Sequence, residues 1–266
     1  MTSDFLDSAG VPIHYVERGA GEPVVLVHSF TGTFQSQFVD TGLADALARR
    51  YRVVGFDLRG HGASGKPHDP AQYGVEMALD VVRLLDHFAL DRAHVVGYSL
   101  GAHIVAQLLT LHPERLLTAV LGGACGRRRW TAADEARVAV EADELEHGLL
   151  NTQLLRLWPH DRPSPDDAQL RALSEKYLAG NDLLALAAIR RSNRAQVVRD
   201  EALAALHVPT LGIVGSEDPY VGRFRDLQPR MRAMSLVVID GARHDDAAKR
   251  PEFLRAVRDF LAAHAV

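Results

Sequence analysis

Residues 97–101, Gly-Tyr-Ser-Leu-Gly, stand where an apolar run must become a helix within a few positions. The segment before them is typical of a buried strand, and the segment after them is typical of a helix that ends before Pro113. So tight a turn forces its central residue into a strained backbone conformation, and flanking glycines let strand and helix approach without a Cβ clash. The helix also directs free N–H groups toward Ser99. The pentapeptide therefore predicts a strand–turn–helix unit that lifts the Ser99 hydroxyl clear of a sheet.

Short apolar runs alternate with helix-like runs along most of the chain. Continuous apolar strands indicate burial on both faces of a sheet, and their alternation with helices predicts parallel strands. We expect strands over residues 12–19, 23–28, 51–58, 93–99, 116–124, 208–215 and 234–242, and helices over 34–50, 75–90, 100–112 and 251–265.

The alternation is interrupted once. Residues 126–205 contain helix-like stretches and no convincing strand, after which the strand rhythm resumes. We therefore expect residues 1–125 and 206–266 to form an α/β core, with 126–205 as a helical insert. Leucines of this segment and Trp158 supply apolar surface of the kind found in small-ligand sites, although packing of the insert on the core would explain most of them.

Five motifs occur in an order that resembles the α/β-hydrolase superfamily, in particular its carboxylesterase-like serine branch with a helical cap. They are VHSFTGT, DLRGHGASGKP, GYSLG, GSEDP and GARHDDAAKRPEFL. The GYSLG motif has the strand and helix context that the family's nucleophile turn requires. The resemblance implies an α/β-hydrolase fold, with a mostly parallel central sheet flanked by helices and a cap inserted after the sixth strand.

The resemblance also implies a catalytic triad. Ser99 is the expected nucleophile, and because a serine hydroxyl is weak at neutral pH it needs a base, for which His244 is the candidate. Asp218, which follows a late strand, is favoured as the acid that orients His244. Other carboxylates near these positions are chemically competent and stay open as alternatives: Glu217, Asp240, Asp245 and Asp246.

The expected oxyanion hole uses two backbone N–H groups. One belongs to Leu100, directly after the nucleophile, and by resemblance the other belongs to Phe30. Serine replaces the usual glycine at position 29, so this loop departs from the common pattern. We expect the substrate pocket to include His28, Ser29, Tyr98 and Trp158.

The charge pattern gives no indication of a nucleic-acid or membrane partner. The net charge is −4, which does not favour nucleic-acid or membrane surfaces, and the basic run 127–129 is interpreted as a solvated turn. The first ten residues lack a basic stretch followed by an apolar one, so we expect a cytoplasmic protein. No metal-ligand spacing or phosphate-binding loop is found, so no metal or cofactor is expected. The expected partner is a small-molecule substrate, and the oligomeric state has no sequence signal.

These features favour a cofactor-independent serine hydrolase that cleaves a carboxylic ester of a small or medium apolar substrate through an acyl-enzyme on Ser99. A serine at this position argues against the branches that use aspartate, the dehalogenases and epoxide hydrolases. Two alternatives stay open: a C–C bond hydrolase or lyase of a catabolic or biosynthetic pathway, and a slow-turnover ligand-binding protein on the same fold.

Overall fold

The computed structural model describes residues 2–159 and 162–265, which are built around one eight-stranded sheet. The strands lie in the order β1-β2-β4-β3-β5-β6-β7-β8. β2 pairs antiparallel with both β1 and β4, and every other pair is parallel. The strands are β1 (Thr2–Ser8), β2 (Val11–Arg18), β3 (Glu22–Val27), β4 (Tyr51–Phe56), β5 (Ala93–Tyr98), β6 (Leu116–Gly122), β7 (Thr210–Gly215) and β8 (Met234–Ile239).

The central strands have the burial that their apolar runs predicted. β5 and β7 are buried at every residue, so both faces of the sheet are covered. The mostly parallel sheet flanked by helices is thus confirmed. Because the strands from β4 to β8 are parallel, their carboxyl ends lie along one edge, where such sheets bind ligands.

The first strand was not predicted. Most residues of β1 are exposed, and β1 pairs with β2 alone. The two strands are joined by Ala9 and Gly10, which both have positive φ, at 54° and 82°. An edge strand needs hydrogen bonds from only one neighbour, so its composition can stay polar and gives little sequence signal.

Helices cover both faces of the sheet. α1 and α10 belong to the apolar cluster on one face, which includes Phe38 and Phe253. α2, α3 and α9 belong to the cluster on the other face, which includes Met77 and Phe224. None of the described helices has both the length and the apolar character needed to cross a bilayer. The bounds are α1 (Leu43–Ala48), α2 (Val75–His87), α3 (Leu100–Leu111), α9 (Val221–Leu227) and α10 (Pro251–Ala263).

The single helix predicted over residues 34–50 is wrong. The segment forms a π-type turn, η1 (Gln35–Val39), followed by the short helix α1. Gly42 separates them with φ 79°, a left-handed conformation that glycine adopts without strain and that interrupts a regular helix.

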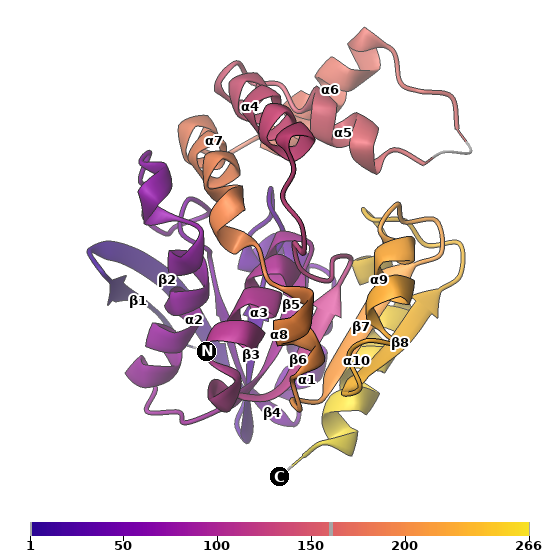
Figure 1. Ribbon diagram of the computed structural model, residues 1–266. Coiled ribbons are helices and arrows are strands. Elements are labelled where there is room, and N and C mark those ends of the chain that lie inside the picture. The colour runs from indigo at the N-terminus through magenta and orange to yellow at the C-terminus, as the bar shows by residue number, and fades with distance from the viewer. Residues whose placement is uncertain (1, 160–161, 266) are drawn as a thin grey trace.

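Helices occupy the chain between β6 and β7. Figure 1 shows α4 to α7 standing beyond the edge of the sheet, with α7 leading back to the core. α8 packs on α3 of the core although it lies within the range expected for the cap, and α7 also contacts the core segment Pro70–Gln72. The division at residues 126 and 205 stays a prediction. The bounds are α4 (Ala132–Glu146), α5 (Asn151–Leu157), α6 (Asp167–Leu178), α7 (Leu183–Arg191) and α8 (Asp200–Ala204).

Candidate active site

Ser99 occupies the turn between β5 and α3 in a strained conformation, with φ 53° and ψ −107°. Its own N–H donates to the Gly122 carbonyl at 2.8 Å, which ties the turn to β6. A Cβ at Gly97 would lie 2.4 Å from the Gly101 carbonyl oxygen, and one at Gly101 would lie 2.0 Å from that of Val27. Both glycines are therefore required by close backbone approach, which confirms the steric argument made from the sequence.

A continuous hydrogen-bonded chain joins Ser99, His244 and Asp218. The Ser99 Oγ lies 2.9 Å from His244 Nε2, and His244 Nδ1 lies 2.8 Å from Asp218 Oδ2. The second carboxylate oxygen of Asp218 accepts from the Tyr220 N–H at 2.8 Å, and Asp218 is only 1% exposed. The carboxylate is thereby fixed toward the imidazole, the arrangement in which histidine takes a proton from serine.

The neighbouring carboxylates make other contacts. Glu217 forms an ion pair with Arg243 at 2.9 Å, and Asp246 accepts from the Arg243 N–H at 2.9 Å. Asp245 is exposed. Of the carboxylates considered from the sequence, Asp218 is the one that the structure brings to His244.

Tyr98 lies behind the histidine. Its hydroxyl donates to the His244 carbonyl at 2.6 Å, and the two ring centroids are 5.8 Å apart. Burial and the nearby Asp218 carboxylate raise the Tyr98 pKa well above its ordinary value, so this hydroxyl remains a donor. Tyr98 was expected in the substrate pocket, but it does not line the cavity described below and instead supports the loop that carries His244.

The two expected oxyanion-hole residues lie beside Ser99. Leu100 is the first residue of α3, so its N–H has no acceptor within the helix. Phe30 lies in the loop after β3, and its carbonyl contacts the buried His61 Nε2. Phe30, Leu100 and Ser99 all line one cavity, so the two expected oxyanion-hole residues and the nucleophile border the same space.

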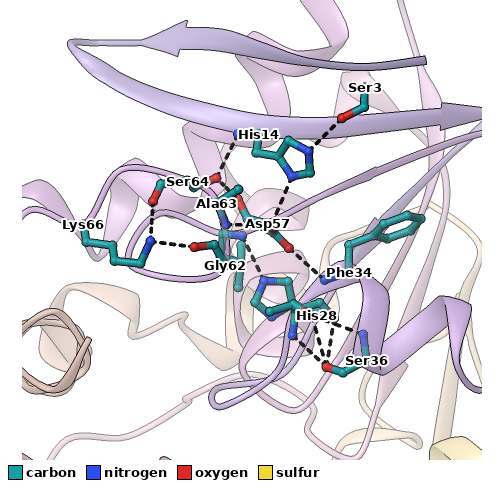
Figure 2. Close-up of polar contacts among 12 residues, drawn as sticks. Ser3, His14, His28, Phe34, Ser36, Asp57, Gly62, Ala63, Ser64 and Lys66 are labelled. Carbon is teal, nitrogen blue, oxygen red and sulfur yellow. Dashed lines mark hydrogen bonds and ion pairs between the residues drawn. The ribbon is translucent and has the colours of Figure 1, made fainter. Parts of the chain in front are cut away.

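A buried carboxylate holds this loop in place. Figure 2 shows Asp57 accepting from the N–H groups of Phe34 and Ala63, each at 3.0 Å, and contacting His14 Nδ1 at 3.1 Å. Burial by itself would raise the pKa of Asp57. These hydrogen bonds and the nearby His28 lower it by a larger amount, so the pKa of Asp57 is below its ordinary value. The charged carboxylate therefore clamps the segments after β3 and β4 together.

His28 and Ser29 belong to the support of this loop and do not line the cavity in which they were expected. His28 Nε2 accepts from the Leu58 N–H at 2.9 Å, and its Nδ1 donates to the Ser29 carbonyl at 2.8 Å. Burial and the adjacent His61 lower the pKa of His28 to about 3. The hydroxyl of Ser29 donates to Gln37 at 2.7 Å. The serine that replaces glycine at this position is thus tied to η1.

A cavity of about 560 Å³ contains Ser99 and His244 in its wall. The rest of the wall is dominated by arginines from the loop after β6, the helices α4, α5 and α7, and α9. They are Arg127, Arg128, Arg129, Arg137, Arg156, Arg190 and Arg223.

The interpretation of residues 127–129 as a solvated turn is wrong for its first two members. Arg127 and Arg128 are not exposed and face the cavity together with the more exposed Arg129. The remaining arginines come from positions far apart in the chain, so no local sequence spacing predicts that they line one cavity. The run of three arginines just after a predicted strand was the one sequence signal that could have indicated a basic cavity.

Trp158, the remaining expected pocket residue, lies elsewhere. It lines a separate surface depression with Arg162 and Pro163, and its indole N–H donates to the Pro163 carbonyl at 3.0 Å. Within residues 2–159 and 162–265, no three His, Cys, Asp or Glu side chains are gathered as a metal site would require.

Comparison with known proteins agrees with this fold. A family model described as "alpha/beta hydrolase fold" matches residues 22–246. The pimeloyl-[acyl-carrier protein] methyl ester esterase of Aeromonas hydrophila is 30% identical over 274 aligned positions, covering 92% of this chain and 98% of that protein. A thermophilic esterase from Thermogutta terrifontis superposes with a TM-score of 0.81 at 20% identity, covering 100% of both chains.

A more local similarity involves a longer protein. The dihydrolipoyllysine-residue acetyltransferase component of the acetoin cleaving system of Cupriavidus necator is 36% identical over 118 residues. That match covers 44% of this chain and 30% of the relative.

Proposed function

The chain belongs to the α/β-hydrolase fold family, and we propose that it is a serine hydrolase which cleaves a carboxylic ester of a small molecule. The observation that carries this proposal is the chain of contacts from Ser99 Oγ through the His244 ring to the Asp218 carboxylate, at 2.9 and 2.8 Å. The similarity to a methyl ester esterase over nearly the full length of both chains supports the same reaction class.

The first half of the reaction forms an acyl-enzyme. Ser99 Oγ attacks the ester carbonyl carbon while His244 Nε2 takes its proton, and Asp218 stabilises the resulting imidazolium. The N–H groups of Leu100 and Phe30 donate to the oxyanion of the tetrahedral intermediate. His244 then gives the proton to the alkoxy oxygen as the C–O bond breaks and the alcohol leaves.

The second half releases the acid. A water molecule gives a proton to His244 as its oxygen attacks the acyl carbon, and the same N–H groups stabilise the second oxyanion. Collapse of this intermediate breaks the bond to Ser99 Oγ, which recovers its proton from His244. The nucleophile and each proton transfer come from residues of this chain and from water, so the proposed reaction requires no cofactor.

Covalent labelling tests this proposal. We expect a fluorophosphonate to modify the protein at Ser99, and Ser99→Ala to abolish labelling while lowering ester turnover by about 10⁴-fold or more. Ser235→Ala, which changes an exposed serine of β8, is the matched control and should label normally. Labelling that persists in Ser99→Ala, or an unchanged esterase rate, would contradict the assignment.

The alternatives give different readouts in the same assays. A slow-turnover ligand-binding protein would release one equivalent of alcohol in a burst and then stop. A C–C bond hydrolase would leave a chromogenic ester panel largely uncleaved although Ser99 is labelled.

A further inference from the structure

The cavity that contains Ser99 carries more positive than negative charge. Among the residues that the structure describes, two carboxylate residues, Asp134 and Asp226, line it together with seven arginines. His103 of α3 lines the same cavity, and its pKa is lowered well below its ordinary value by burial first and then by the charges of four of these arginines. We call these four residues the arginine cluster: Arg127, Arg156, Arg190 and Arg223.

One carboxylate serves several of these guanidinium groups. Glu141, which is 2% exposed, lies 3.2 Å from Arg156 Nε and 3.3 Å from Arg190 Nε. It also lies 3.0 Å from Arg137, which has a further partner in Asp134 at 2.9 Å. A single carboxylate cannot neutralise both Arg156 and Arg190 while it is shared with a third arginine.

The other two members of the cluster have less compensation. Arg223 is exposed, and its guanidinium lies 4.7 Å from the centroid of the Tyr220 ring. Within the part of the chain that the structure describes, neither Arg127 nor Arg223 forms an ion pair, and the buried Arg127 Nε has no hydrogen-bond acceptor. The Arg190 Nε also lacks a hydrogen bond of good geometry although Arg190 is only 6% exposed. Burial, followed by repulsion from Arg190, lowers the pKa of Arg127 to about 10. A buried guanidinium nitrogen without an acceptor is costly, so the unsatisfied Nε atoms of Arg127 and Arg190 point to a missing anion.

Ion pairs within the protein account for the position of Arg128 in the cavity wall but not for that of Arg127. Arg128, which also lines the cavity, lies 3.2 Å from Asp200 and 2.8 Å from Asp226, so its charge is already balanced by two carboxylates. Arg127 lies in the same loop but has no such carboxylate partners. The guanidinium of Arg190 lies 3.7 Å from the centroid of the Phe30 ring, which links the cluster to the proposed oxyanion loop.

We propose that the arginine cluster binds an anionic group of the substrate, a carboxylate or a phosphate, while the scissile bond lies at Ser99. Arginine suits this role because its guanidinium pairs with two oxygens of such a group at once. This inference rests on the proposed function, because it assumes that the substrate is an ester. It changes the expected substrate from an apolar ester to an ester that bears a negative charge.

A binding experiment tests the cluster without relying on turnover. Ser99→Ala is titrated calorimetrically with glutarate, with inorganic phosphate and with neutral glutaramide. We expect glutarate or phosphate to bind and glutaramide not to bind, and we expect affinity to fall as salt is raised. The stronger of the two anions identifies the group. No binding of either anion, or equal binding of glutaramide, overturns the proposal.

Variants locate the binding. In the Ser99→Ala background, the second substitution Arg127→Gln should weaken anion binding by about 10-fold or more, since a charge-assisted hydrogen bond is lost. Arg127→Lys should retain more affinity than Arg127→Gln, and its circular dichroism spectrum verifies folding. Arg49→Gln removes the same charge from an exposed position after α1 and should leave binding unchanged. Equal losses in Arg127→Gln and Arg49→Gln would show a nonspecific charge effect and overturn the site.

A kinetic comparison separates this inference from the proposed function. With Ser99 intact, kcat/KM should be higher for monomethyl glutarate than for dimethyl glutarate, and Arg127→Gln should lower that ratio by about 10-fold. Hydrolysis of both esters without preference refutes the anion site but leaves the esterase. Glutarate binding to the cluster without hydrolysis of either ester refutes the esterase but leaves the anion site.

Discussion

At the scale of the residue, Ser99 combines reactivity with backbone strain. A non-glycine residue at φ 53° and ψ −107° costs roughly 1–3 kcal/mol, and such strain persists only where its surroundings enforce it. Here β6 accepts the Ser99 N–H and the two flanking glycines permit close packing. The strain therefore places the hydroxyl within hydrogen-bonding distance of His244 and at the wall of the cavity.

The role of Asp218 leads to a prediction at the same scale. Asp218→Asn keeps the shape of the side chain but favours the wrong imidazole tautomer, which in a serine protease costs up to about 10⁴-fold in turnover. We expect a loss of this order in the ester-hydrolysis rate constant. Glu217→Gln is the matched control, because Glu217 pairs with Arg243 at the surface, and it should keep most activity. The reverse result would assign the acid to Glu217.

At the scale of the element, the packing of α3 on the sheet depends on Gly101. Alanine normally favours a helix over glycine by about 1 kcal/mol, but a Cβ at position 101 would lie 2.0 Å from the Val27 carbonyl oxygen. The clash involves backbone and cannot be relieved by a rotamer change. We predict that Gly101→Ala lowers the free energy of unfolding by about 1–3 kcal/mol or more, as overpacking does.

Denaturant unfolding measures this effect, and α9 offers the control. A Cβ at Gly222 would meet nothing within 4 Å, so Gly222→Ala should be neutral or stabilising by about 0.4–1 kcal/mol. If both variants lose the same stability, close approach of α3 to β3 is not what requires glycine at position 101.

The sequence predicted elements that carry a continuous apolar run or a helical apolar spacing, and site residues that stand in short contiguous motifs. Residues 93–112 carry both the strand–helix pattern and the nucleophile turn, so local chemistry was sufficient there. β1 was missed because an exposed edge strand needs no apolar run. The arginine cluster was missed because its members come from different elements, and only the placement of α5, α7 and α9 around one cavity brings them together.

At the scale of the whole molecule, buried neutral histidines link folding to pH. Burial is the largest cause that lowers the pKa values of His28, His61 and His103, and for His28 the value is about 3. An unfolded histidine titrates near 6.5, so between that pH and the lower folded pKa the unfolded chain binds more protons than the folded one. Their contribution to stability is fully present above about pH 6.5 and is lost as the pH falls below it.

We therefore predict that the free energy of unfolding decreases from pH 7 to pH 5, with His28 contributing a slope of up to about 1.4 kcal/mol per pH unit. Urea unfolding at several pH values measures the slope. His28→Gln offers an amide that still accepts from Leu58 and donates to Ser29 but does not titrate, so its profile should be flatter than that of the unmodified protein. The Asp57 carboxylate acts in a lower range, because its pKa is shifted downward from an already acidic value. Identical slopes for the two proteins would mean that His28 takes up a proton in the folded state as readily as in the unfolded state, contrary to its burial between Leu58 and Ser29.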